Sequence, residues 1–273
     1  MWIDTHCHLD AHEFGGGGAE ALAVAGRAGA AGVSMIVIPA VERGNFAAVA
    51  GLAHAAPNAS YALGIHPICV PQARDEDLPA LRAAVEAAMD DPRFVAIGEI
   101  GLDFFIPLLC EPAMREKQER FFREQLRIAR DFDLPVLTHV RRSQDQVLKH
   151  LRQITPPGGI AHAFNGSEQQ ANTFIRLGMH LGFGGAMTFT RALQIRRLAT
   201  GLPLDRIVLE TDAPDISPVW VHPGRNSPEQ LPAIGAALAD LRGIGEPDVR
   251  VAAWDSSIAA IPRLAPLLPS RPA

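Results

Sequence analysis

The 273-residue sequence predicts an α/β protein, a (β/α)8 TIM barrel built as a single domain. Three observations support this prediction. The length lies near the roughly 250 residues of a typical barrel of this class. Short apolar segments alternate with longer helix-patterned segments along nearly the whole chain. Residues able to bind metal ions stand at the ends of many apolar segments, and a barrel brings the carboxyl ends of all its strands to one face.

Eight strands are expected, each as a short apolar segment. They cover residues 2–5, 33–38, 62–65, 94–98, 135–138, 159–161, 180–183 and 206–209. The second is apolar almost throughout, as is typical of a parallel strand buried on both faces. Eight strands that alternate with helices fit either a closed barrel or an open doubly wound sheet. The first strand is not followed by G-x-G-x-x-G, and the positions of the candidate ligands favour the barrel.

The segments between the strands carry apolar residues at helical spacing. The clearest helix is expected over residues 114–132, where Phe121, Phe122, Leu126 and Ile128 lie among charged and amide residues. No long Pro/Ser-rich linker divides the chain, and the glycines at 15–18 are too few for one. We therefore expect one barrel domain over residues 1–265. A Pro-rich tail over 266–273 is expected to fray.

Composition limits the possible functions. The formal net charge is −5, from 25 Lys and Arg against 30 Asp and Glu, so no basic surface for long nucleic acids is expected. The three cysteines fit a reducing cytoplasm. No apolar run reaches the roughly 18 residues that cross a membrane, and His6 and His8 stand where a cleavable leader would lie. A cytoplasmic protein without membrane association is expected, and no obligate protein partner is indicated.

The first candidate ligands are His6 and His8. Alternate side chains of an extended segment point the same way, so both imidazoles can face one site while Cys7 faces elsewhere. Further candidates end other strands. These are His66 at the third, Glu99 at the fourth, His139 at the fifth, His162 at the sixth and Asp212 at the eighth.

Four imidazoles (His6, His8, His139 and His162) and two carboxylates (Glu99 and Asp212) exceed what one catalytic metal needs, since a single zinc takes three protein ligands and one water. The six suit two divalent ions that share a carboxylate. Such a pair suits phosphoryl transfer, because negative charge develops on both the attacking and the leaving oxygen. The identity of the ions, Mg, Mn or Zn, stays open.

The chain resembles the TatD-type metal-dependent deoxyribonucleases, a family of amidohydrolase-like barrel enzymes. The resemblance lies in IDTHCHLD at 3–10, GIHP at 64–67, GEIGLD at 98–103, TH at 138–139, HAF at 162–164, ETDAP at 210–214 and RNSP at 225–228. It extends from residue 2 to about residue 235. It implies hydrolysis of DNA phosphodiesters, with 3′-5′ exonuclease action on single strands. DNA ends or short nucleic acids are thus the expected substrates.

The resemblance also implies roles for individual residues. His6 and His8 would bind the first metal and His139 and His162 the second, with Glu99 bridging the two ions. Asp212 would bind metal and contact the attacking water. His66 would lie in the pocket and contact the substrate or the transition state, so Asp212, Glu99 and His66 form the expected catalytic set.

The sequence departs from the family pattern at two places. Ala163 stands where the family often has Cys, a position that is not a ligand. Residues 256–262 lack the Asn and the Leu-Phe pair that usually mark the last helix, which puts the C-terminal packing in doubt.

Substrate contacts and alternative functions are less well defined. Arg141, Arg142, Arg225 and Asn226 follow strand ends or lie in late loops, where they could hold flanking phosphates. The main alternative is a hydrolase of cyclic amides or lactones on the same barrel. Many of those enzymes bridge their metals with a modified lysine, and no strand end here carries Lys. A metal-binding scaffold without catalysis is the third possibility.

Overall fold

The computed structural model describes residues 1–271, and its centre is one sheet of eight parallel strands in chain order. The strands are β1 (Trp2–Asp4), β2 (Val33–Pro39), β3 (Ala59–Leu63), β4 (Phe94–Asp103), β5 (Val136–Arg141), β6 (Gly159–Ala161), β7 (Met179–Phe183) and β8 (Ile207–Leu209). Each pairs with the next in parallel. Thr5 N donates to Leu209 O at 3.2 Å, which joins the first strand region to the last. The predicted (β/α)8 barrel is confirmed.

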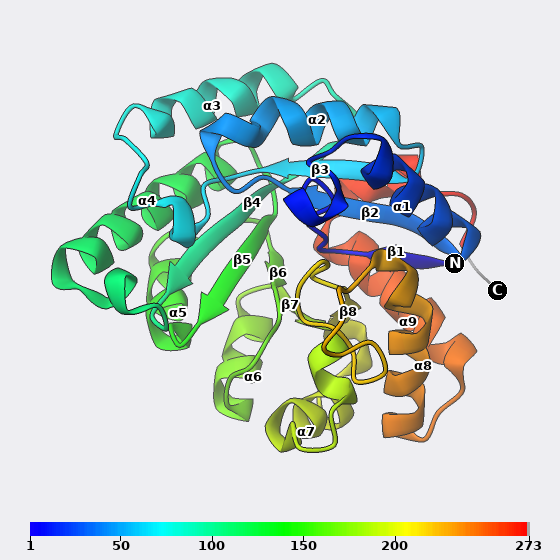
Figure 1. The fold of residues 1–273 in the computed structure, drawn as a ribbon. Coiled ribbons are helices and arrows are strands. Elements are labelled where there is room, and N and C mark those ends of the chain that lie inside the picture. Colours follow the sequence, from blue (N-terminus) through cyan, green and yellow to red (C-terminus); the bar gives the residue numbers. More distant parts are fainter. Residues whose placement is uncertain (272–273) are drawn as a thin grey trace.

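The helices lie around the outside of the strands (Figure 1). They are α1 (Ala19–Ala30), α2 (Phe46–Ala55), α3 (Asp77–Ala88), α4 (Pro112–Asp131), α5 (Gln144–Gln153), α6 (Glu168–Arg176), α7 (Leu193–Gly201), α8 (Leu231–Arg242) and α9 (Glu246–Ala260). The longest, α4, begins at Pro112, where a missing N–H costs nothing. It buries Phe121, Phe122 and Leu126 against the barrel, as their helical spacing predicted.

The fourth strand is longer than its apolar segment predicted. It continues beyond Gly98 to Asp103, with an irregular register against β5 between Ile97 and Ile100. Gly101 has a φ of 150°, and a Cβ at this position would overlap the backbone of His139. Only glycine therefore permits the close approach of β4 and β5 here. The extension places Glu99 within the strand rather than at its end.

Two apolar cores hold the barrel. One lies between the strands and the surrounding helices, and the other fills the barrel interior. Trp254 of α9, with Ile261 and Leu264, belongs to the interior core together with strand residues such as Val95. The 3-10 helix Pro262–Leu267 follows, and its Arg263 donates to the backbone oxygen of Phe94. This segment supplies the C-terminal apolar packing that the atypical sequence of the last helix had put in doubt. In the expected Pro-rich tail, Pro272 and Ala273 lie outside the described residues.

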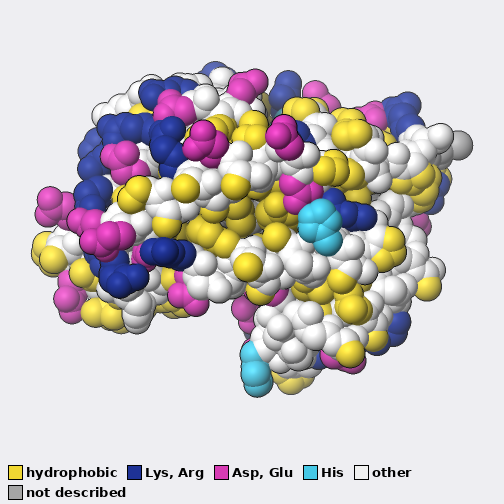
Figure 2. Space-filling view, turned by 90° about the horizontal axis from the view of Figure 1, so that it is seen from above, with side chains coloured by type: hydrophobic (Ala, Val, Ile, Leu, Met, Phe, Trp, Pro, Cys, Tyr) yellow, Lys and Arg dark blue, Asp and Glu magenta, His cyan; other side chains and the backbone are white. Residues whose placement is uncertain are grey.

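The surface carries mixed charge. On the face that Figure 2 shows, basic side chains gather toward one side and alternate there with acidic ones, and apolar side chains occupy much of the middle. Within residues 1–271 no helix is both long and apolar enough to cross a membrane.

Candidate metal centre

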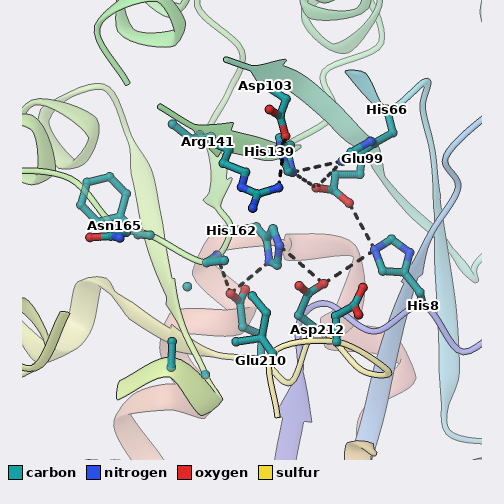
Figure 3. Close-up of a pocket in the computed structure, with 18 of the residues that line it drawn as sticks. His8, His66, Glu99, Asp103, His139, Arg141, His162, Asn165, Glu210 and Asp212 are labelled. Carbon is teal, nitrogen blue, oxygen red and sulfur yellow. Dashed lines mark hydrogen bonds and ion pairs between the residues drawn. The ribbon is translucent and has the colours of Figure 1, made fainter. Parts of the chain in front are cut away.

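The six predicted ligands and His66 converge at the carboxyl end of the barrel. His8, His66, Glu99, His139, His162 and Asp212 line one cavity of about 900 Å³, and His6 lies directly beneath them with an exposed fraction of 1%. Figure 3 shows six of these side chains turned toward one another from different strands and strand ends, namely His8, His66, Glu99, His139, His162 and Asp212. The sequence prediction that strand ends bring the six candidate ligands together therefore agrees with the geometry.

Glu99 lies between two groups of imidazoles. Its Oε2 is 3.0 Å from Nε2 of His6 and 3.4 Å from Nε2 of His8. Its Oε1 is 3.0 Å from Nδ1 of His139 and 3.3 Å from Nε2 of His66. Each carboxylate oxygen thus faces a different pair of rings, which is the arrangement that a carboxylate shared by two cations requires.

Asp212 faces the first of these groups. Its Oδ1 lies 3.7 Å from Nε2 of His8 and 3.5 Å from Nε2 of His162. Its backbone has a φ of 54°, a left-handed conformation that Asp adopts more readily than most residues. Its N–H donates to His6 O at 2.9 Å, which fixes the turn after β8 beside the first strand.

Asp103 orients the ring of His139. Nε2 of His139 lies 3.0 Å from Oδ2 of Asp103, a carboxylate only 1% exposed. A carboxylate accepts only, so Nε2 carries a proton, and Nδ1 is the atom that would offer a lone pair to a cation beside Glu99. Such a carboxylate–histidine pair is typical of metal ligands, because it fixes the tautomer and the ring orientation.

Glu210 is a second carboxylate beside a candidate ligand, in this case His162. Its Oε1 lies 3.0 Å from Nδ1 of His162 and accepts from the backbone N–H of Ala163 at 2.6 Å. With a cation bound at Nε2, this carboxylate would hold the remaining proton of the ring on Nδ1. The ring of His162 also stacks on that of His6 with a centroid distance of 3.7 Å.

His66 differs from the other imidazoles. Its Nδ1 accepts from the backbone N–H of Ile68 at 3.0 Å, so the proton of the neutral ring is on Nε2. Burial lowers the pKa of His66 to about 4, and the ring is therefore neutral at pH 7. In this tautomer Nε2 faces Nδ1 of His139 at 3.0 Å and Oε1 of Glu99 at 3.3 Å, so its N–H points into the site.

The charge of the site favours cations. Burial alone would raise the pKa of Glu99, but the imidazoles of His66 and His6 hold that pKa well below its ordinary value. Burial would lower the pKa of His162, but Glu210 above all raises it to about 10. The lone pairs of four imidazoles and two carboxylates meet here in a small buried volume. Three overlapping groups of ligand atoms lie close enough for a cation: His6, Glu99 and His162; His6, His8 and Asp212; and His66, Glu99 and His139.

Asp103 and Glu210 had no assigned role in the sequence analysis. Both stand inside quoted motifs, four residues after Glu99 and two residues before Asp212. The alternation of side chains along a strand could have indicated that Glu210 and Asp212 share a face. The contact of Asp103 with His139 depends on the close approach of β4 and β5, which no sequence spacing shows.

The predicted substrate contacts do not all reach the cavity. Arg141 and Arg142 line it, and Figure 3 shows the Arg141 guanidinium turned toward its middle. Arg225 lies over the Phe14 ring at 4.7 Å and lines an adjoining groove instead.

Asn226 is fully buried, and its Nδ2 donates to backbone oxygens of Thr211, Asp215 and Ile216. Its Oδ1 accepts from the N–H of Ser227, so Asn226 holds the loop after β8 and leaves no atom for a substrate.

A parallel barrel with buried imidazoles and carboxylates at its carboxyl end is typical of metal-dependent hydrolases. The comparison with known proteins gives the family. Residues 3–260 match the model of the TatD related DNases, and the chain belongs to this family, a family of metal-dependent hydrolases.

Relatives of the chain cover most of its length. It is 40% identical over 242 residues to the uncharacterized metal-dependent hydrolase YjjV of Escherichia coli strain K12, covering 88% of this chain and 90% of that protein. The crystal structure of YjjV, a TatD homologue, superposes with a TM-score of 0.88 over 96% of this chain and 98% of that one, at 38% identity. A Salmonella typhimurium protein named 3′-5′ ssDNA/RNA exonuclease TatD is 32% identical over 227 residues, covering 81% of this chain and 84% of that protein.

Proposed function

We propose that this hydrolase binds two divalent metal ions and removes nucleotides from the 3′ end of single-stranded DNA. The observation that carries the proposal is the position of Glu99, whose two oxygens face two different pairs of imidazoles at 3.0–3.4 Å. A carboxylate between two cation sites is typical of enzymes that cleave phosphodiesters. The name of the Salmonella relative supports the choice of nucleic acid.

The donor set suggests which residues would hold each ion. His6, His8 and Asp212 form one compact group and would hold the first ion. Oε2 of Glu99 would join them, since it lies 3.0 Å from His6 and 3.4 Å from His8. His139 would hold the second with Oε1 of Glu99. The family resemblance assigns His162 to the second ion. Its Nε2 lies 3.5 Å from Oδ1 of Asp212 and in one group with His6 and Glu99, so this geometry favours the first ion for His162.

Two bound cations would supply a nucleophilic hydroxide at neutral pH and neutralise charge on the transferred phosphate. The side chains of the chain do the rest. Asp212 lies beside the first group with an exposed fraction of 14%, so it can orient water and accept its proton. The protonated Nε2 of His66 can donate to a phosphate oxygen as charge develops there. The buried Asp103 and Glu210 keep His139 and His162 in their ligating tautomers.

The shape of the site supports action on chain ends. The cavity opens at the barrel mouth, where a terminal nucleotide enters more readily than the paired interior of a duplex. The mixed surface charge and the net charge of −5 offer no track for a long duplex.

The test uses a single-stranded oligodeoxynucleotide labelled at its 5′ end, with Mg²⁺, Mn²⁺ or Zn²⁺ supplied separately. We expect labelled products that shorten one nucleotide at a time. Immediate release of labelled mononucleotide would show 5′ attack, and internal fragments would show an endonuclease. Cleavage of a cyclic amide without cleavage of DNA would favour the alternative hydrolase. That alternative is weakened because the cavity lining within residues 1–271 includes no lysine.

A further inference from the structure

An aromatic ring and two arginines form a stacked group at the mouth of the cavity. The guanidinium carbon of Arg141 lies 3.8 Å from the centre of the Phe105 ring, and that of Arg142 lies 4.6 Å from it. All three residues line the cavity that contains the metal ligands. We call Phe105, Arg141 and Arg142 the Phe–Arg platform.

The exposure of this group calls for an explanation. Phe105 is 44% exposed and the Arg141 side chain is 49% exposed. Exposure of a phenyl ring to water is unfavourable in free energy. The contacts with guanidinium groups hold the ring in place without burying it. Exposed aromatic surface next to a polar site is typical of ligand contact.

The chain places the platform next to the metal ligands. Oδ1 of Asp103 accepts from the N–H groups of Phe105 and Ile106 at 2.8 and 3.1 Å, while its Oδ2 accepts from His139. One buried carboxylate thus fixes both a metal ligand and the loop that carries the ring. Arg142 has a φ of 54°, a conformation rare for a long side chain and common where function requires a particular direction.

We propose that the Phe–Arg platform binds a nucleobase of the single strand, namely the base on the 5′ side of the scissile phosphate. This inference rests on the proposed function. A planar base can stack on the ring or on a guanidinium, and the positive charges of Arg141 and Arg142 attract the phosphate that follows the base. Stacking tolerates any base, because every base has an aromatic face. The platform therefore favours single strands without selecting their sequence.

A cycle that combines one protein variant with one modified substrate separates this role from a general effect on the site. Two 5′-labelled oligodeoxynucleotides differ only at the penultimate residue, which is either a normal nucleotide or an abasic tetrahydrofuran analogue. With the wild-type protein, we expect the KM of the abasic oligomer to be about tenfold higher at similar kcat, the size expected when one base–aromatic stack is lost. In Phe105→Ala, both oligomers should show the higher KM, so that the difference between them disappears.

Two control variants sharpen the result. Leu108→Ala removes another apolar side chain of the same loop, 51% exposed but outside the cavity lining, and should keep the tenfold difference. Phe105→Trp should also keep it, because an indole stacks at least as well. Metal content and thermal midpoint should stay unchanged in Phe105→Ala, since the ring is exposed.

The outcomes distinguish the two proposals. If the wild type cleaves both oligomers with the same KM, or if Phe105→Ala keeps the tenfold difference, the platform does not bind the base while the nuclease function stands. If the wild type cleaves neither oligomer with any of the three metals, the proposed function fails and the base subsite fails with it.

Discussion

The two ends of the barrel interior are built from the same strands but differ in composition. At the carboxyl end the side chains are imidazoles and carboxylates, gathered around Glu99 with an exposed fraction of 1%. At the amino end the interior is apolar, and Leu264 and Trp254 fill it from outside the sheet. Burying charges makes the free energy of folding less favourable, whereas burying apolar groups makes it more favourable. The apolar amino end therefore stabilises the fold, whereas the buried charges of the carboxyl end lower its stability.

Backbone conformation shows the same contrast. Among residues 1–271, five non-glycine residues have positive φ. Four of them line the cavity at the carboxyl end, namely Arg142, Ala163, Asp212 and Ile216. Such conformations cost of order 1–3 kcal/mol each in general and persist where surrounding contacts enforce them. We therefore expect substitutions at the carboxyl end of the barrel to change activity and metal binding, and substitutions at the amino end to change stability.

The largest effect is expected for Asp212→Asn. Asn tolerates positive φ and keeps the shape of the side chain, but it cannot accept a proton from water. We expect kcat to fall by about a thousandfold or more with the thermal midpoint nearly unchanged. The measurement is steady-state hydrolysis beside metal analysis. Wild-type kcat in this variant would refute the role of Asp212 in proton transfer.

The next effect concerns Glu99→Gln, which preserves volume and removes the negative charge between the two groups of imidazoles. We expect metal affinity to fall by about a hundredfold or more, since an amide bridges cations poorly and the surrounding imidazoles lose their compensating charge. Metal bound after dialysis at defined free metal concentration is the readout. Glu124→Gln removes the same charge at a partly exposed site outside the cavity lining and serves as the control for altered charge. Unchanged metal content in Glu99→Gln would contradict a bridging role.

Substitution at the amino end should have the opposite signature. Leu264 is fully buried in the interior core, so Leu264→Ala removes apolar contacts and leaves a cavity. We expect a loss of about 3 kcal/mol in the free energy of unfolding, with kcat and metal affinity within about twofold of wild type. Denaturant unfolding together with activity measures both. A large loss of kcat at wild-type stability would show that the two ends are not separable.

The smallest effect concerns pH. His180 of β7 is 3% exposed, and burial with the charge of Arg206 lowers its pKa to about 4. The folded pKa is below the unfolded value of about 6.5, so protonation favours the unfolded chain. Its contribution to stability is complete above pH 6.5 and is lost as the pH falls toward 4. Between pH 7.5 and 5 this amounts to about 2 kcal/mol.

His180→Gln should remove that part of the pH dependence, because a glutamine does not titrate. Unfolding free energies of the two proteins, measured over this pH range, give the difference in slope. Parallel curves would mean that His180 is not responsible.

Much of the fold could be predicted from the sequence, because parallel strands buried on both faces are short apolar runs. The convergence of His139, His162 and Asp212 followed from the geometry of a barrel, which gathers strand ends at one face. What remained out of reach depends on tertiary contacts. Asn226 looked available in a late loop, yet folding buries its amide among backbone oxygens. Phe105 stacks on Arg141, the last residue of β5, and on Arg142, which follows it. These residues are more than thirty positions apart in the sequence, and no periodic pattern indicates that they meet.

The filling of the barrel interior by residues 254–264 has a consequence for biosynthesis. All eight strands precede this segment in the chain. The sheet can close only after β8 has been synthesised, because β8 lies beside the region that follows β1. A growing chain at the ribosome can therefore form helices and pair neighbouring strands, but its innermost apolar surface stays open to water until α9 and the turn after it have emerged. During that interval exposed strand edges and apolar side chains are targets for aggregation or for chaperones. The apolar interior of the barrel is therefore completed last, after all of its strands.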